Sequence, residues 1–219
     1  MIFWIASAAG LAIAYLMGAT PTGYLAGKLL KGIDLREHGS KSTGATNVLR
    51  ILGKGPALAV LIIDVLKGAL AVLLARWFWT WLDTFSSLAP FDLQTTLPWA
   101  VCLAGLAAIL GHGRSLWLNF TGGKSVATGL GVLLAMSWPV GLGALAVFAI
   151  LLAIFRIVSL GSIAAAVTAI ALAFALQQPL PYQLLVLAGG IYVIVRHRTN
   201  IQRLLAGTEP RLGQTSPGA

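Results

Sequence analysis

Residues 56–78 read PALAVLIIDVLKGALAVLLARWF, and this stretch decides the class of fold. Its charged side chains are Asp64, Lys67 and Arg76, and the rest is almost wholly apolar. A helix of about 20 apolar residues is long enough to cross the hydrocarbon core of a bilayer. The stretch therefore predicts a membrane-spanning helix, with Pro56 well suited to its first turn.

The whole chain has the composition of a membrane protein. Its 219 residues are 58% hydrophobic and 10% charged, and the mean hydropathy is +0.89. A soluble domain usually has about 25% charged residues. We predict an all-α integral membrane protein with one domain over residues 1–219 and a flexible tail at 212–219.

Six further apolar stretches predict six more spans. They are residues 2–26, 97–110, 125–137, 139–155, 158–176 and 182–195. Pro21 and Gly23 should loosen or kink the last turns of the first span, and the small pair Gly23 and Gly27 should let a neighbouring helix approach closely. The spans 97–110 and 125–137 are short. Either they extend into their flanks, or one of them only dips into the membrane.

The distribution of positive charge predicts the orientation. With seven spans and the N-terminus outside, 14 of the 15 Lys and Arg residues lie on the inner side and only Arg76 lies outside. Cytoplasmic loops carry such an excess, so the C-terminus should be cytoplasmic. The net charge of +9 is thereby explained without a nucleic-acid partner. The first charged residue is Lys28, so no basic signal region precedes the first span, which we expect to be retained.

Three polar segments interrupt the apolar sequence, and the predicted spans place all three on the same side. The first polar segment is residues 39–50 (GSKSTGATNVLR), the second is 121–128 (TGGKSVAT), and the third is 196–209, which begins RHRTN. Each combines cations with hydroxyls or amides. Such groups beside lipid predict an anionic, phosphorylated substrate handled at the membrane surface.

In the second polar segment, Gly122 and Gly123 allow close backbone approach to a ligand. The free N–H groups of a helix beginning near Ser125 suit an anion, and Lys124 adds a full charge. The Gly-Lys-Ser sequence looks like the end of a P-loop, but Leu118 stands where that pattern needs glycine. We therefore exclude an NTPase. The alternative is a tight turn between helices with a lysine that only sets topology.

In the first polar segment, Ser40, Thr46, Asn47 and Arg50 would form a cradle for phosphate oxygens. A loop rich in hydroxyls is often only a connector. We favour a functional role for Ser40 and Arg50, and a solvated surface position for His38.

In the third polar segment, His197 and Asn200 share a helical face, and His197 is a candidate proton acceptor. The alternative is a basic anchor that touches anionic lipid. We expect Glu209 to tie the tail to a cytoplasmic arginine.

Other polar residues allow simpler interpretations. Asp64 and Lys67 lie one turn apart and predict an ion pair inside the membrane. His112 either lines the site or packs near it, and Cys102 is expected to be a packing residue. The acids and histidines are too scattered to predict a metal site, and no cofactor is expected.

At these residues the sequence resembles the acyl-phosphate-dependent glycerol-3-phosphate acyltransferases of bacteria, the PlsY type. The matching stretches are residues 21–24, 32–37, 39–40, 44–50, 64–68, 122–124, 126–128, 158–160, 196–198 and 200–205. The chain departs from the family pattern at Lys41 and Ser42, where Gly-Asn is common, and at Ser125, where glycine is common. It also has Gly18-Ala-Thr-Pro21 where Gly-Ser-Ile-Pro is common.

The resemblance implies about seven transmembrane helices in the bacterial inner membrane, with the active site facing the cytoplasm. It implies transfer of a fatty acyl group from acyl phosphate to the sn-1 hydroxyl of glycerol 3-phosphate, giving lysophosphatidic acid and inorganic phosphate, the first acylation of phospholipid synthesis. Membrane lipids are the other expected partners, and the oligomeric state stays open, a monomer included.

The residues expected to take part form three groups. Those expected to act in catalysis are Ser40, Arg50, Lys124 and His197. Those expected to bind substrate are Thr46, Asn47, Gly122, Gly123, Thr128, Ser159 and Asn200, and those expected to be structural are Glu209, Asp64 and Lys67.

Two other functions fit parts of the pattern. A transporter for an anionic metabolite would explain the basic segments, but it predicts polar groups at mid-membrane in repeated halves, and no repeat is evident. A non-catalytic scaffold leaves the clustered hydroxyls and glycines unexplained. For the acyltransferase, either His197 or the phosphate of the acceptor is the expected proton acceptor.

Overall fold

The computed structural model describes residues 2–84 and 92–213, and over these ranges the chain is helical, with one isolated β-bridge between Ser115 and Thr121. The longer helices are α1 (Ile2–Ala19), α4 (Lys54–Asp83), α5 (Leu93–Gly113), α6 (Val126–Met136), α7 (Trp138–Phe155), α8 (Val158–Ala175) and α9 (Leu180–Arg196). The short ones are α2 (Thr22–Lys31), η1 (Leu35–Glu37), α3 (Ala45–Leu52), η3 (Leu116–Leu118) and α10 (Arg198–Leu205). Residues 214–219 of the predicted tail lie outside the described ranges.

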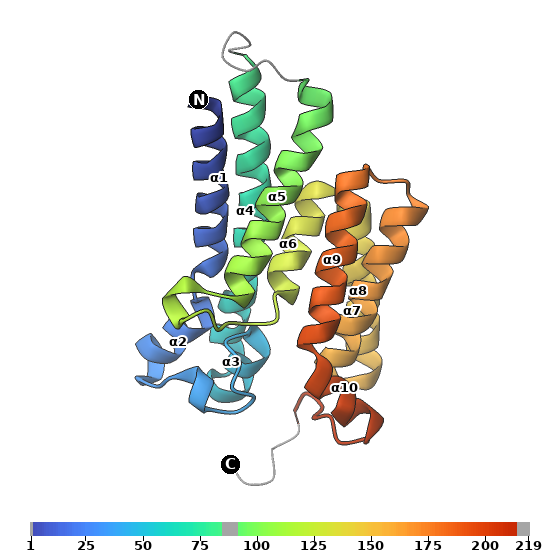
Figure 1. Ribbon diagram of the computed structural model, residues 1–219. Coiled ribbons are helices and arrows are strands. Elements are labelled where there is room, and N and C mark those ends of the chain that lie inside the picture. Colours follow the sequence, from blue (N-terminus) through green and yellow to red (C-terminus); the bar gives the residue numbers. More distant parts are fainter. Residues whose placement is uncertain (1, 85–91, 214–219) are drawn as a thin grey trace.

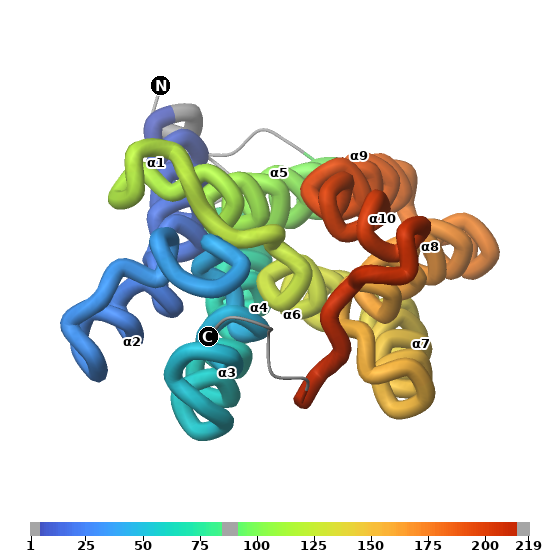
Figure 2. The backbone as a smooth tube through the Cα atoms, turned by 90° about the horizontal axis from the view of Figure 1, so that it is seen from below, coloured from blue at the N-terminus to red at the C-terminus, as the bar shows by residue number. Residues whose placement is uncertain are grey.

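The longer helices run side by side as a bundle, and α2, α3 and α10 gather at one end of it (Figure 1). The N-terminus lies at the opposite end. Viewed from the end that carries the short helices, α2 and α3 lie on one side of α6, and α9 and α10 lie on the other (Figure 2). The three polar segments, remote in sequence, therefore share one end of the molecule, as predicted.

The helices are those of an integral membrane protein. Within the described residues, four helices are long and apolar enough to cross a membrane, and there are up to six if two bent pairs each count as one span. Of the two alternatives for the short span at 97–110, extension into its flanks is confirmed, because α5 has 21 residues and extends at both ends. The predicted short helix after Ser125 is confirmed. Helix α6 has 11 residues, so it rises about 16 Å, roughly half the hydrocarbon thickness.

The first predicted span, residues 2–26, is interrupted in the structure. Helix α1 ends at Ala19, and α2 starts at Thr22 with its axis bent by 41°. Pro21 lies in the break, where it has no N–H to continue the helical hydrogen bonds. Gly23 and Gly27 allow the close approach that was expected, but it comes mostly from the loop and the short helix η1 that follow α2, with Val48 of α3 also next to Gly23. A Cβ at Gly23 would collide with the carbonyl of Thr43, and one at Gly27 would press on Leu35, so these glycines admit the loop that leads into the first polar segment.

Small residues bring the helices together. Buried alanines from α1, α4 and α5 pack as one cluster: Ala14, Ala71, Ala104 and Ala108. Larger side chains from α4, α5, α6 and α9 form a second core around Val72, Val101 and Val132. Many other large apolar side chains are exposed, as Leu66, Leu70 and Leu73 are on α4, which is the arrangement expected where lipid is the solvent.

Candidate active site

The first polar segment is folded around one buried amide. The side chain of Asn47 is 1% exposed. Its Nδ2 donates to the carbonyls of Leu35, His38 and Ser42 at 2.9–3.1 Å, and its Oδ1 accepts from the backbone N–H of Ser40 at 2.8 Å. We expected Asn47 to bind substrate. Its hydrogen-bonding groups are instead engaged within the loop, so Asn47 shapes the segment that presents Ser40.

The other expected residues of this segment are more open. Ser40 and Arg50 are exposed, and Thr46 is partly buried. Thr46 lies in the first turn of α3 and Arg50 in the last, so they occupy one face of the helix. Arg50 is close enough to Lys124 for its charge to affect that amine. A charge in the first polar segment therefore influences the lysine of the second.

The second polar segment lies against the end of α5. The N–H of Gly123 donates to the carbonyl of His112 at 3.2 Å. A Cβ at Gly122 would collide with that carbonyl, and one at Gly123 would collide with the His112 ring. We expected these glycines to admit a ligand. His112 occupies the side on which a Cβ of either glycine would lie, while Gly122 also lines the pocket described below. Their lack of side chains lets the loop pack closely on α5.

Arg196, at the end of α9, fixes the same loop from the other side. Its guanidinium donates from Nη2 to the carbonyls of Gly122 and Gly123, each at 3.0 Å. The sequence suggested only a topology anchor at Arg196. Nothing in a single sequence indicates this pairing, because the partners are 74 and 73 residues apart.

Lys124 is held by a chain of side chains from α8, α10 and the tail. Its Nζ donates to Asn200 Oδ1 at 2.5 Å, and Asn200 Nδ2 donates to Glu209 Oε1 at 2.6 Å. Ser159 donates to the same carboxylate oxygen at 2.7 Å. Arg203 pairs with Glu209 Oε2 at 2.6 Å, which confirms the predicted bond between the tail and an arginine. Ser159 and Asn200, expected to bind substrate, thus position Glu209 and Lys124.

The charges and the burial around Lys124 change the pKa of its amine. Burial lowers the pKa of Lys124 to about 8; the carboxylate of Glu209 opposes that shift, and the charges of Arg203, Arg196 and Arg50 add to it. For Glu209, burial favours the neutral acid, but hydrogen bonds from Asn200, Ser159 and Arg203 outweigh it and lower the pKa below its usual value. The carboxylate is therefore ionised at neutral pH, and Lys124 is largely charged.

His197 lies near this cluster but is bonded to its own helix. It is 3% exposed, and its Nδ1 lies 2.7 Å from the carbonyl of Val193, so Nδ1 must carry the proton as the donor. Burial, reinforced by the charge of Lys124, lowers the pKa of His197 to about 4 although the hydrogen bond to Val193 opposes the shift. A neutral imidazole of such low basicity is a weak proton acceptor at pH 7.

Thr128 is the remaining expected contact. It is 0% exposed, and its Oγ1 has no hydrogen-bond partner among the described residues. Direct contact with substrate would require α6 to move. The hydroxyl is a buried polar atom that still needs an account.

A pocket of about 250 Å³ opens between the first and second polar segments. It is lined by Arg36, Lys41, Thr43, Thr121 and Gly122. Arg36 is paired with Asp34 at 2.7 Å, and Lys41 is exposed. The lining thus offers cations, hydroxyls and backbone, which suits a small anion.

The fold and this site define a class, an integral membrane protein that gathers lysine, arginine and hydroxyl groups at one end of a helical bundle to receive anions. The chain belongs to the glycerol-3-phosphate acyltransferase family, whose sequence pattern matches residues 8–207.

Relatives support this assignment over nearly full length. The chain is 74% identical to glycerol-3-phosphate acyltransferase 2 of Rhizobium johnstonii, covering 99% of this chain and 100% of that one. It is 60% identical to the glycerol-3-phosphate acyltransferase of Acaryochloris marina, covering 93% and 91%.

Solved structures agree in fold. The chain is 36% identical to PlsY (YgiH), an integral membrane glycerol 3-phosphate acyltransferase, in its glycerol 3-phosphate form, with a TM-score of 0.83 over 95% of this chain and 96% of that one. The lysophosphatidic acid form of that protein matches with a TM-score of 0.80 and 35% identity over the same shares.

Proposed function

We propose that this protein transfers a fatty acyl group from acyl phosphate to the sn-1 hydroxyl of glycerol 3-phosphate, producing lysophosphatidic acid and inorganic phosphate. The reaction takes place at the cytoplasmic face of the bacterial inner membrane, in a seven-span bundle with its N-terminus outside. The observation that carries the proposal is Lys124, held by Asn200 and Glu209 beside the loop that Arg196 fixes. Membership of the family supplies the acceptor, and the likeness to the glycerol 3-phosphate form of PlsY supports it.

Two phosphorylated substrates must approach each other in this site, so their repulsion must be screened. Lys124 and Arg50 supply two positive charges for the phosphates. The pocket beside Arg36 and Lys41 offers further donors. Each contact places the reacting groups within reach of one another, which by itself contributes much of the rate.

In the proposed step the sn-1 oxygen of glycerol 3-phosphate attacks the acyl carbonyl carbon. The new ester C–O bond forms, the bond from the acyl carbon to the phosphate oxygen breaks, and phosphate leaves as a stable anion without a strong general acid. The hydroxyls of Ser40 and Thr46 are the candidate donors to the oxyanion. Removing one such donor typically lowers the rate about 100- to 1000-fold.

The proton of the attacking hydroxyl passes to a substrate phosphate in this proposal. A phosphate monoester has a second pKa of about 6, whereas the pKa of His197 is about 4. The phosphate is therefore the stronger base of the two. We expect His197→Ala to keep kcat within about 10-fold of the wild type and to leave the pH–rate profile in place. A loss of about 100-fold or more, the size of a missing general base, would restore His197 to that role.

The donor is tested with purified protein in lipid nanodiscs. Palmitoyl phosphate, palmitoyl-CoA and palmitoyl-acyl carrier protein are compared with radiolabelled glycerol 3-phosphate, and lysophosphatidic acid is quantified. We expect turnover with the mixed anhydride only. Turnover with a thioester and not with palmitoyl phosphate would overturn the assignment.

A matched pair of lysine variants connects this activity to the site. Lys124→Met should lower kcat/KM on the order of 100- to 1000-fold, as expected for the loss of one preorganised charge. Lys54→Met, at the exposed start of α4, should leave it unchanged. Equal effects of the two variants would show that Lys124 has no special part.

A further inference from the structure

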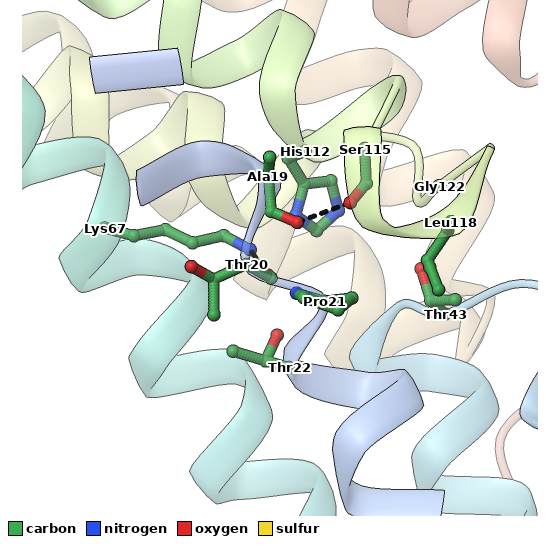
Figure 3. Close-up of a pocket in the computed structure, with 10 residues that line it drawn as sticks. All are labelled: Ala19, Thr20, Pro21, Thr22, Thr43, Lys67, His112, Ser115, Leu118 and Gly122. Atoms are coloured by element: carbon green, nitrogen blue, oxygen red, sulfur yellow. Dashed lines mark hydrogen bonds between the residues drawn. The ribbon is translucent and has the colours of Figure 1, made fainter. Parts of the chain in front are cut away.

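A buried polar cluster lies where α1 breaks into α2 (Figure 3). Lys67 Nζ is 2.8 Å from Asp64 Oδ1, which confirms the predicted ion pair. Lys67 also donates to the carbonyl of Thr20 at 2.9 Å, and the hydroxyl of Thr22 donates to Asp64 Oδ1 at 2.5 Å. Asp64 is 1% exposed and Lys67 is 6% exposed. The pair thus fixes both sides of the break at Pro21.

Ionisable groups inside a membrane protein are costly, and they are usually retained for a function. Removing one partner of such a buried pair is strongly destabilising, because the other charge is left buried without compensation. The residues that contact this cluster indicate which part of the site it could position. They belong to α5 and to the loop that follows it.

His112 connects the cluster to the second polar segment. Its Nδ1 lies 3.7 Å from Asp64 Oδ1, and the side chain is 7% exposed. Its carbonyl accepts the N–H of Gly123, and its ring fills the place that a side chain at Gly123 would take. One residue thus touches the ion pair through its ring and the Gly123–Lys124 loop through its backbone.

The same loop is tied to α1 at a second point. Ser115 Oγ donates to the carbonyl of Ala19 at 2.5 Å, a contact drawn in Figure 3, and Tyr15 donates to the carbonyl of Arg114 at 2.7 Å. The break in the first helix and the loop that carries Lys124 therefore form one packed unit.

We infer that Asp64, Lys67 and His112 are positioning residues that set the height and direction of Lys124 through the contact between His112 and Gly123. This inference rests on the proposed function for its meaning, since Lys124 is the charge that receives phosphate. A purely structural ion pair would stabilise the bundle without acting selectively on this loop. A positioning role and a purely structural role therefore differ in which measurements a substitution changes.

The first test is a double-mutant cycle on kcat/KM for glycerol 3-phosphate. Gly123→Ala alone should lower kcat/KM about 100-fold, because its Cβ collides with the His112 ring and a displacement of about 1 Å has that effect. His112→Ala makes room, so the double variant should be at least about 10-fold more active than the product of the single losses predicts. Gly129→Ala, which has open space around it, is the control and should be neutral. Strict additivity would overturn the inference.

His112→Gln replaces His112→Ala in the cycle if the alanine variant does not purify as a folded protein. If the wild type itself shows no transfer from acyl phosphate, the proposed function fails and the cycle cannot be measured. The inference is then tested by the second experiment alone.

The second test uses no substrate. Hydrogen exchange is followed by mass spectrometry in wild type and Asp64→Asn, comparing peptides that cover residues 118–125 with peptides from α7. We expect exchange in 118–125 to become about 10-fold faster through local opening, with α7 unchanged. An increase spread evenly over the bundle would identify a merely structural pair, and no increase would show that Asp64 does not reach the loop. Either result overturns the inference.

Discussion

The first and second polar segments are both loops that present polar groups to the site, yet they are built in opposite ways. Every hydrogen bond of Asn47 that shapes the first segment reaches no more than 12 residues along the chain. The second segment also has short-range bonds, among them the one from Gly123 to His112, but its bonds to Ile109, Asn200 and Arg196 span 16 to 76 residues. The first loop can take its shape as soon as α3 forms, whereas the second needs α5, α9 and α10 in register. Distant substitutions should therefore affect the second loop and leave the first one intact.

Replacing Asn47 should give the largest effect. It tests whether the first loop is held by its own short-range hydrogen bonds. Asn47→Ala leaves three carbonyls and one N–H without their partner, and each unsatisfied buried group typically costs about 1–3 kcal/mol. We expect the free energy of unfolding to fall by about 3 kcal/mol, measured by thermal denaturation in detergent. Faster hydrogen exchange should be confined to residues 35–47. Gln202→Ala, an exposed amide on α10, is the control. Faster exchange in residues 118–125 would contradict the view that Asn47 stabilises only its own loop.

Replacing Glu209 tests the long reach of the second loop. Glu209→Gln removes the negative charge that raises the pKa of Lys124, so that pKa should fall below about 8. If charged Lys124 binds phosphate, as proposed, activity is present below its pKa and is lost as the pH rises through it. The alkaline limb of kcat/KM should therefore move to lower pH. At pH 8 the expected loss is on the order of 5-fold, equivalent to somewhat less than one pKa unit.

Glu37→Gln serves as the control for that experiment, since Glu37 is an exposed acid outside the cluster. It should leave the pH profile in place. An unchanged alkaline limb in Glu209→Gln would mean that the tail carboxylate does not influence Lys124.

The smallest expected effect concerns backbone strain in the first loop. Lys41 has a φ of +54°, a conformation that costs a residue with a side chain about 1–2 kcal/mol. Lys41→Gly should raise the free energy of unfolding by up to about 1 kcal/mol, since the flexibility of glycine in the unfolded chain offsets part of the gain.

Gly32→Ala is the matched opposite of that variant. Gly32 has a φ of +67° in open space, so alanine there should lower stability by about 1 kcal/mol. Both are measured by the same thermal denaturation. Changes of the same sign in the two variants would show that the positive φ is not the cause.

The sequence predicted much of the fold because a long apolar stretch is a direct indication of a membrane-spanning helix. The predicted spans end within a few residues of α7, α8 and α9. Helix α5 was underestimated because its first turns are polar. Pro21 correctly indicated a disturbance of the first span, but the sequence did not show that the helix ends at Ala19 and starts again at Thr22. Hydropathy does not report a bend.

The site was predicted less completely, and the reason lies in long-range contacts. Composition indicated which segments matter, and the spacing of Asp64 and Lys67 correctly predicted an ion pair. Composition could not separate Arg50, whose charge acts on Lys124, from Asn47, whose hydrogen bonds lie within its own loop. The partners of Gly122, Gly123 and Ser159 depend on how α5, α9 and the tail pack, and no local pattern contains that information.

The tail described earlier has a practical consequence for handling the protein. Glu209 is bonded to Arg203, Asn200 and Ser159, and the N–H of Leu212 donates to the carbonyl of Arg156 at 2.7 Å. A truncation after Leu205, which hydropathy alone would judge harmless, takes away the carboxylate that steadies the amine of Lys124. Purification handles are therefore best attached before α1, whose start lies at the far end of the bundle (Figure 1).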